Sequence, residues 1–243
     1  MIYLTGATND QIEPWLVAHG IRLMVQPGNG YAHRVDRYHT WAADNGCFAD
    51  KWDEKRWSAW LAHLPVSGCL FAVAPDVYPD ATASLQRGME FAPEIRSLGL
   101  PVAVVAQDGA ERLVWDWDTI DCLFLGGEQR VPGRDEWKES TEAERLVAEA
   151  RNAGLWVHMG RVNTVRRLQR AEQMGVLSCD GTLVKHLLRT RSGERRNDRD
   201  RRVAAQMRSW GDALRSPPLP LRRWESPAHP QHRAVAMLTE EDA

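Results

Sequence analysis

Short apolar runs recur along the chain, with polar, helix-like stretches or loops between them. Eight such runs, rich in Val, Ile, Leu and Phe, lie at residues 2–6, 21–27, 40–46, 70–77, 102–108, 122–127, 156–162 and 176–181. This alternation is typical of parallel strands covered by helices. Eight units in one chain predict an α/β fold, a closed (β/α)8 TIM-like barrel.

A doubly wound open sheet is the competing fold. It is disfavoured because no G-x-G-x-x-G follows the first run, and because polar residues recur at too many strand ends for a single switch point. Helix signals support the alternation. Thr141 and Glu144 form a capping box, and Asn163 is placed to cap a helix that ends before Gly175.

The length of 243 residues suits one domain, since such barrels commonly run about 200 to 250 residues. The composition, 43% hydrophobic and 26% charged, is that of an ordinary globular protein, and no apolar run of about 18 residues is present. We therefore expect no membrane segment. The start MIYLTGATND lacks the basic and small-residue pattern of a signal peptide, so a cytoplasmic protein is expected.

The cysteines exclude two classes of site. Cys47, Cys69, Cys122 and Cys179 are scattered singly, with no C-x-x-C pair. This pattern predicts neither a zinc knuckle nor a disulfide framework. We expect no metal and no cofactor.

Charge is distributed unevenly along the chain. Residues 185–223 carry 12 Lys or Arg against 4 Asp or Glu, although the whole chain has a net charge of −2. Such a stretch would neutralise the phosphates of a nucleic acid lying across it. A solvated, salt-bridged helix face is the alternative.

The same stretch sets the expected domain boundaries. Residues 192–213 read as a basic helix, and the prolines of SPPLPLRRW cannot continue it, so an extended linker follows. We expect the barrel at residues 1–190, the basic helix and Pro-rich linker at 191–224, and a weakly ordered tail at 225–243.

Polar residues mark the ends of six of the predicted strands, where barrel enzymes place their active sites. They are Asp44 with Asn45, Asp76, Gln107 with Asp108, Gly126 with Gly127, His158 with Arg161, and Asp180 with Gly181. Each alone is typical of a turn, but six together predict an active site. His158 alternates with Met159, so one of the two should face the barrel interior, and a core histidine is expected.

The ordered set of strand ends resembles a family, the tRNA-guanine transglycosylases and their relatives, the DNA 7-deazaguanine transglycosylases. ADNGCF (43–48) is similar to the family's D-S-G-G-F segment, and PDVYPD (75–80) to its base-reading aspartate region. VVAQDG (104–109), LFLGGE (123–128), VHMGRV (157–162) and VLSCDGT (176–182) resemble its later strand segments in the same order.

The resemblance implies a pentosyltransferase that replaces guanine in DNA with a 7-deazaguanine-type base through an aspartyl covalent intermediate. Asp180 would be the nucleophile, and Asp44 the general acid/base. Substrate contacts are implied for Asp76, Gln107, Gly126, Gly127, Met159 and Asn45.

The chain departs from the tRNA enzymes because it lacks their C-x-C-x-x-C zinc segment. DNA is therefore expected as partner rather than tRNA, with a 7-deazaguanine-type free base as second substrate and a flipped or single-stranded target base. Phosphate contacts are expected from the basic segment, at Lys185, Arg195, Arg196, Arg199 and Arg202. Two alternatives remain: a DNA N-glycosidase or hydrolase with the same aspartates, and a non-catalytic nucleic-acid binding protein.

Overall fold

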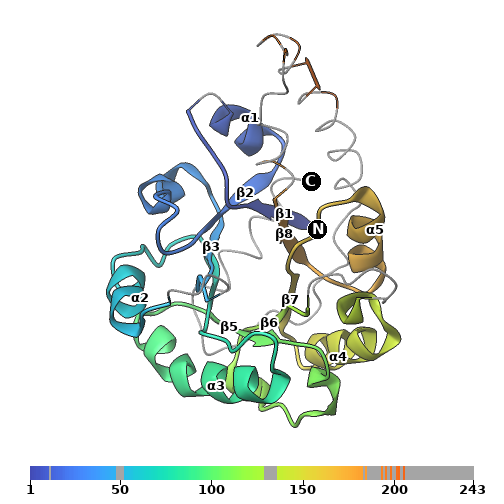
Figure 1. Cartoon of the computed structure of the whole chain (residues 1–243). Coiled ribbons are helices and arrows are strands. Elements are labelled where there is room, and N and C mark those ends of the chain that lie inside the picture. Colours follow the sequence, from blue (N-terminus) through green and yellow to red (C-terminus); the bar gives the residue numbers. More distant parts are fainter. Residues whose placement is uncertain are drawn as a thin grey trace.

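The fold is a closed barrel of eight parallel strands, and Figure 1 shows it end on in a computed structural model. The structure describes residues 1–10, 12–47, 52–128 and 136–182, together with single positions at 184, 193, 195, 198, 201, 202 and 205. The strands follow chain order around the barrel, and β1 pairs with β8 to close it. The predicted fold class is confirmed.

Each predicted apolar run overlaps with one strand. The strands are β1 (Ile2–Thr5), β2 (Ile21–Val25), β3 (Trp41–Ala43), β4 (Cys69–Val73), β5 (Val102–Ala106), β6 (Cys122–Leu125), β7 (Trp156–Met159) and β8 (Ser178–Gly181). The observed strands are shorter than the apolar runs, because the polar residues at the carboxyl ends turn the chain away from the sheet. The residues predicted as functional lie at or beyond those ends.

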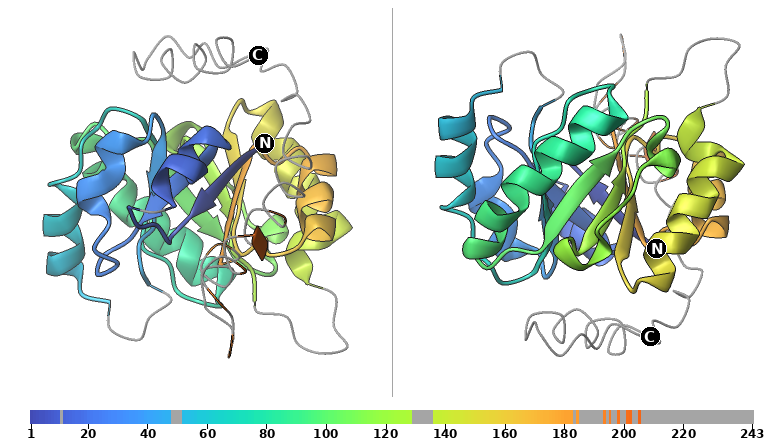
Figure 2. Two further views of the ribbon diagram at one scale, coloured as in Figure 1. Left: turned by 90° about the horizontal axis from the view of Figure 1, so that it is seen from above. Right: turned by 90° about the horizontal axis from the view of Figure 1, so that it is seen from below.

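In the described part of the chain, five α-helices and four 3-10 helices connect the strands. They are α1 (Glu13–Ala18), η1 (Ala32–Arg37), α2 (Glu54–Leu61), α3 (Ala81–Ser97), η2 (Ala110–Arg112), η3 (Trp117–Thr119), η4 (Trp137–Glu139), α4 (Thr141–Asn152) and α5 (Val165–Gln173). Within the described ranges, helices cover the outside of the barrel unevenly, because only the short η2 and η3 lie between β5 and β6. Figure 2 shows the helices packed around the outside of the strands.

Two helix starts differ from prediction by one residue. Ser140, rather than Thr141, caps α4 by accepting from the backbone N–H of Ala143. Thr164, rather than Asn163, caps α5. Adjacent Ser, Thr and Asn residues can all serve as caps, so the pattern alone does not choose between neighbours.

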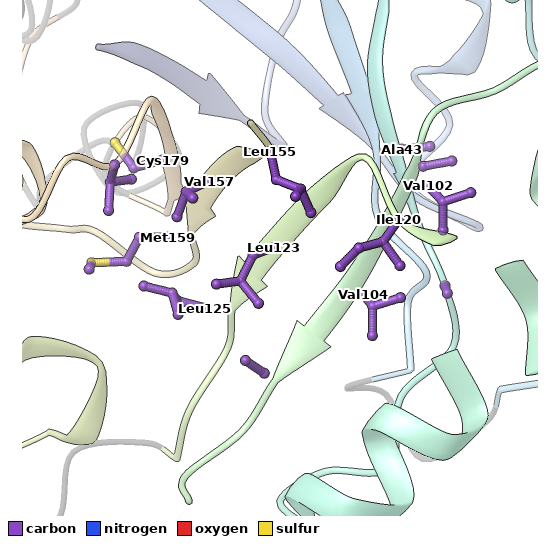
Figure 3. Packing of buried hydrophobic residues seen from close by; sticks show 14 of the residues in the cluster. Ala43, Val102, Val104, Ile120, Leu123, Leu125, Leu155, Val157, Met159 and Cys179 are labelled. Atoms are coloured by element: carbon purple, nitrogen blue, oxygen red, sulfur yellow. The ribbon is translucent and has the colours of Figure 1, made fainter. Parts of the chain in front are cut away.

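The core has two layers, which follow from the alternation of side chains along each strand. The larger cluster joins strand residues such as Leu123, Val157 and Met159 to the covering helices, and Figure 3 shows part of it. The smaller cluster contains strand residues, including Phe71 and Trp156, and fills the barrel interior. Successive residues of β7 therefore face different layers.

Among the described residues, no helix has both the length and the apolar character that crossing a bilayer requires.

Candidate functional site: an acidic cluster at the barrel mouth

Asp44 follows β3 directly and is the most perturbed carboxyl group of the site. Its backbone N–H donates to the carbonyl of Val25 at 2.7 Å, which fixes the turn out of the strand. Burial, followed by the charges of Asp180 and Asp76, raises the pKa of Asp44 to about 7, although backbone N–H groups of Gly46 and Asn45 act in the opposite direction. The carboxyl group is therefore poised to exchange a proton near neutral pH.

Asp76 is held by two amide side chains from neighbouring strand ends. Asn45 Nδ2 donates to Asp76 Oδ1 at 2.9 Å, and Gln107 Nε2 donates to Oδ2 at 2.7 Å. Burial raises the pKa of Asp76, and the hydrogen bonds from Asn45 and Gln107 partly offset that effect. The carboxyl group is thus fixed in orientation by donors on both oxygens.

Gln107 contributes an acceptor of its own. The residue is 2% exposed, and its Oε1 has no hydrogen-bond partner among the described residues. A buried carbonyl oxygen without a donor costs free energy, so such a group commonly accepts a hydrogen bond from a ligand or water.

Asp180 lies on β8, opposite the ends of β3 and β4, with a side chain that is 24% exposed. Its Oδ1 is 3.1 Å from His158 Nε2 and accepts from the backbone N–H of Arg161 at 3.3 Å. Asp180 and Asp44 both lie at the carboxyl ends of barrel strands, and the charge of Asp180 is one of the causes that raise the pKa of Asp44.

Arg161 links the ends of β6, β7 and β8. Its φ of 60° is left-handed, which is uncommon for a residue with a side chain. In this conformation its backbone N–H reaches Asp180, while its guanidinium donates to the carbonyls of Gly126 and Gly127. Backbone strain of this kind collects at functional sites.

Lys138 is a buried cation on this side of the barrel. The residue is 1% exposed, and its Nζ donates to the carbonyl of Gly160 at 2.7 Å and lies 3.7 Å from Glu136 Oε2. Burial lowers the pKa of Lys138 to about 8, although Glu136 and Asp180 raise it. A positive charge therefore stands behind Gly160, near Asp180.

The structure brings Asp44, Asp76, Gln107 and Asp180 together as predicted from their strand ends. The roles assigned to three other residues change. Asn45 is buried and uses its amide to hold Asp76 and the carbonyl of Ala74, so it supports the site.

Met159 does not face the mouth. It is fully buried in the layer between strands and helices, because His158 takes the interior position of β7. The predicted contact of Met159 with a base is therefore wrong. The N–H of Gly126 is bound to the carbonyl of Ala106 at 3.0 Å, so this amide does not serve a ligand either.

His158 and Arg161 belong to the predicted set of polar strand ends but received no role in it, and Lys138 was not part of the predicted site. The signal for His158 was its strand position, two residues from the interior Trp156. Neither the left-handed backbone of Arg161 nor the placement of Lys138 after the β6 loop has a signature in the sequence.

Two of the five expected phosphate-binding residues lie within the described part of the chain. Arg195 is exposed and Arg202 half-buried, whereas Lys185, Arg196 and Arg199 lie outside the described residues, as does the linker and tail after position 205. DNA binding by this segment stays a prediction. Within the described part of the chain, no group of three or more His, Cys, Asp or Glu side chains could hold a metal ion.

No protein-family model matches the chain, and no curated protein matches it in sequence. Two similar solved structures are aldolases. One is described as a fructose-1,6-biphosphate aldolase from Coccidioides immitis, with 11% identity, a TM-score of 0.60, and coverage of 88% of this chain and 90% of the other. The other is the YdjI aldolase from Escherichia coli K12, with 11% identity, a TM-score of 0.54, and coverage of 87% and 88%. At this identity the likeness shows the shared barrel fold.

These neighbours contradict the predicted activity, because they are aldolases and not base-exchanging transglycosylases. The displaced Met159 and the occupied amide of Gly126 also remove two contacts on which that prediction relied. Replacement of guanine in DNA by a 7-deazaguanine-type base, and a pentosyltransferase activity with it, are therefore withdrawn.

Proposed function

We propose that this chain is an acid–base enzyme, a carbon–carbon lyase of the aldolase kind, with Asp44 as its general base. The observation that carries the proposal is the partly buried Asp44 carboxyl group, whose pKa of about 7 suits proton transfer at neutral pH. Its position at the carboxyl end of a (β/α)8 barrel is where enzymes of this fold perform their chemistry. The aldolase descriptions of two fold neighbours favour the lyase form.

In the proposed reaction, Asp44 transfers the proton while a carbon–carbon bond of the substrate is cleaved. The ionised carboxylate takes the proton of a substrate hydroxyl group, and the O–H electron pair becomes the second bond of a new carbonyl. The bond between the hydroxyl-bearing carbon and its neighbour breaks, and that electron pair forms an enolate. Asp44 returns its proton to the enolate carbon, which yields the second carbonyl product.

A developing enolate needs positive charge nearby. Lys138 supplies a cation behind Gly160, and its near-complete burial strengthens its field because little water screens it. Its burial and its bond to Gly160 favour action through this field rather than by direct contact with substrate.

The acceptor groups of the mouth favour a particular substrate class. Asp76 and Gln107 Oε1 suit hydroxyl or N–H donors, and three neighbouring carboxyl groups would repel a phosphate placed among them. We therefore propose a neutral hydroxy-carbonyl compound, and fructose bisphosphate is not carried over from the neighbour.

Deuterium exchange tests this function without knowledge of the natural substrate. The protein is incubated in deuterated buffer with dihydroxyacetone, hydroxyacetone, glycolaldehyde and glyceraldehyde, and proton NMR follows loss of the hydrogens next to the carbonyl and formation of aldol products. Exchange is expected with at least one compound. Asp44→Asn should slow it by about 10² to 10⁴, the usual value of general acid–base catalysis.

Asp36→Asn is the matched control, since it makes the same change at an exposed carboxylate of η1. It should exchange at the rate of the unaltered protein. Absence of exchange and of products with all four compounds, or equal rates for Asp44→Asn and the unaltered protein, would overturn the proposal.

A further inference from the structure

A chain of buried polar side chains runs through the barrel interior behind Asp180. Trp156 Nε1 donates to Ser178 Oγ at 2.7 Å, and Ser178 Oγ is 2.8 Å from His158 Nδ1. His158 Nε2 is in turn 3.1 Å from Asp180 Oδ1. His158 and Ser178 are fully buried, and the register of β7 and β8 pairs them directly.

The surroundings of His158 keep its ring neutral. The rings of Phe71 from β4 and Phe124 from β6 pack against it, with centroids at 5.0 and 4.6 Å. Burial is the main cause that lowers the pKa of His158, and the charge of Lys138 from η4 acts in the same direction. Asp180 opposes both. A neutral imidazole carries one N–H and one bare nitrogen.

The direction of each hydrogen bond then follows from its partners. A carboxylate only accepts, so the nitrogen that faces Asp180 must carry the proton, and this is Nε2. Nδ1 is consequently the acceptor, and the Ser178 hydroxyl group donates its hydrogen bond to it. The indole N–H of Trp156 only donates, and it occupies Ser178 Oγ as an acceptor. All three bonds therefore point toward Asp180.

From this geometry we infer that Trp156, Ser178 and His158 form a one-way hydrogen-bonded chain that makes His158 the positioning residue of Asp180. The N–H of His158 and the backbone N–H of Arg161 both bind Oδ1. Among the described residues these donors bind Oδ1 alone, so the carboxylate is fixed with Oδ2 left to meet a substrate at the barrel mouth. The catalytic part of this inference rests on the proposed function, whereas the direction of the chain does not.

The direction is tested on the unaltered protein by nitrogen-15 NMR. Long-range proton–nitrogen correlations of the imidazole rings distinguish a bare nitrogen from one that carries a proton, and loss of one set of signals in His158→Gln assigns the residue. A proton on Nε2 and a bare Nδ1 are expected at neutral pH. A proton on Nδ1, or on both nitrogens, would overturn the inference whatever the enzyme does.

The positioning role is tested with two variants of His158 in the exchange assay. Gln keeps an N–H donor, whereas Leu has none. His158→Leu should lower kcat by about 10- to 100-fold, as expected for one hydrogen bond to a charged group, with KM little changed. His158→Gln should recover most of that loss. Equal kcat for the two variants would contradict a positioning role.

Phe124→Leu is the matched control because it disturbs the same ring packing and leaves the hydrogen bonds in place. It should lower stability and leave kcat nearly unchanged. If no exchange activity is found but Nε2 carries the proton, the proposed function fails while the hydrogen-bonded chain stands. The two conclusions are thus separately refutable.

Discussion

Replacement of Asp44 by Asn should alter the dependence of stability on pH in a defined way. Folded Asp44 keeps its proton up to about pH 7, whereas an unfolded Asp loses it near the ordinary pKa of 3.8. Between these values the folded chain binds more protons, so the stability contributed by Asp44 is present at low pH and is lost as the pH rises through the folded pKa.

The magnitude follows from the size of the shift. One pKa unit corresponds to about 1.4 kcal/mol, so a rise of roughly three units amounts to about 4 kcal/mol between the two limits. Residue 44 keeps partial solvent exposure, and water at the carboxyl group reduces this penalty, which makes 4 kcal/mol an upper bound. Asn does not titrate, so the stability of the Asp44→Asn protein lacks this pH-dependent contribution.

The assay is urea unfolding of both proteins at several pH values from about 5 to 8. The advantage of Asp44→Asn over the unaltered protein should grow with pH, by at most about 1.4 kcal/mol per unit, and level off above pH 7. Titrating groups that are not coupled to Asp44 act equally on both proteins and cancel in the difference, whereas Asp76 and Asp180 interact with Asp44 and contribute to it. Parallel stability curves for the two proteins would refute the assigned pKa.

Three further predictions concern the parts that hold the site. Gly88→Ala would bring a Cβ within 2.7 Å of Val104 Cγ1, so it should destabilise the protein at the contact of α3 with β5 by about 1 to 3 kcal/mol. In a protein that already carries Val104→Ala, the same substitution should cost much less, as measured by thermal unfolding. Arg161→Ala should be less stable than Arg161→Gly by about 1 kcal/mol, because Ala keeps the left-handed strain without the guanidinium bonds; the reverse order in urea unfolding would contradict the strain. Ser140→Ala should lower the free energy of unfolding by about 1 kcal/mol and Thr141→Ala by much less, since Ser140 caps α4. Equal losses for the two variants would contradict Ser140 as the cap.

The strands were predictable from sequence because most of them, such as β4 and β5, are apolar on both faces, which produces a continuous run. The residues gathered at the mouth were predictable for a related reason: Asp44, Asp76 and Asp180 interrupt those runs at the ends where a parallel barrel collects them. Strand order and closure then follow from eight sequential units.

The facing of side chains was not predictable in the same way. A period of two shows that His158 and Met159 face opposite layers, but its phase is set by packing against Phe71 and the helices. The left-handed turn at Arg161 depends on the acceptors it meets, which lie far away in sequence. Short motifs in a shared order suggested an activity that the fold neighbours contradict. Such motifs are poor evidence for one activity, because turn-forming Asp and Gly residues recur at the strand ends of many barrels.

The central claim is that the barrel mouth holds a carboxyl group poised near neutral pH, and a carbon-13 NMR titration of the aspartate side chains measures this directly. The Asp44 carboxyl signal, assigned by its loss in Asp44→Asn, should titrate with a midpoint of about 7. A midpoint near 3.8, the ordinary pKa of Asp, would contradict the claim and remove the general base from the proposed mechanism.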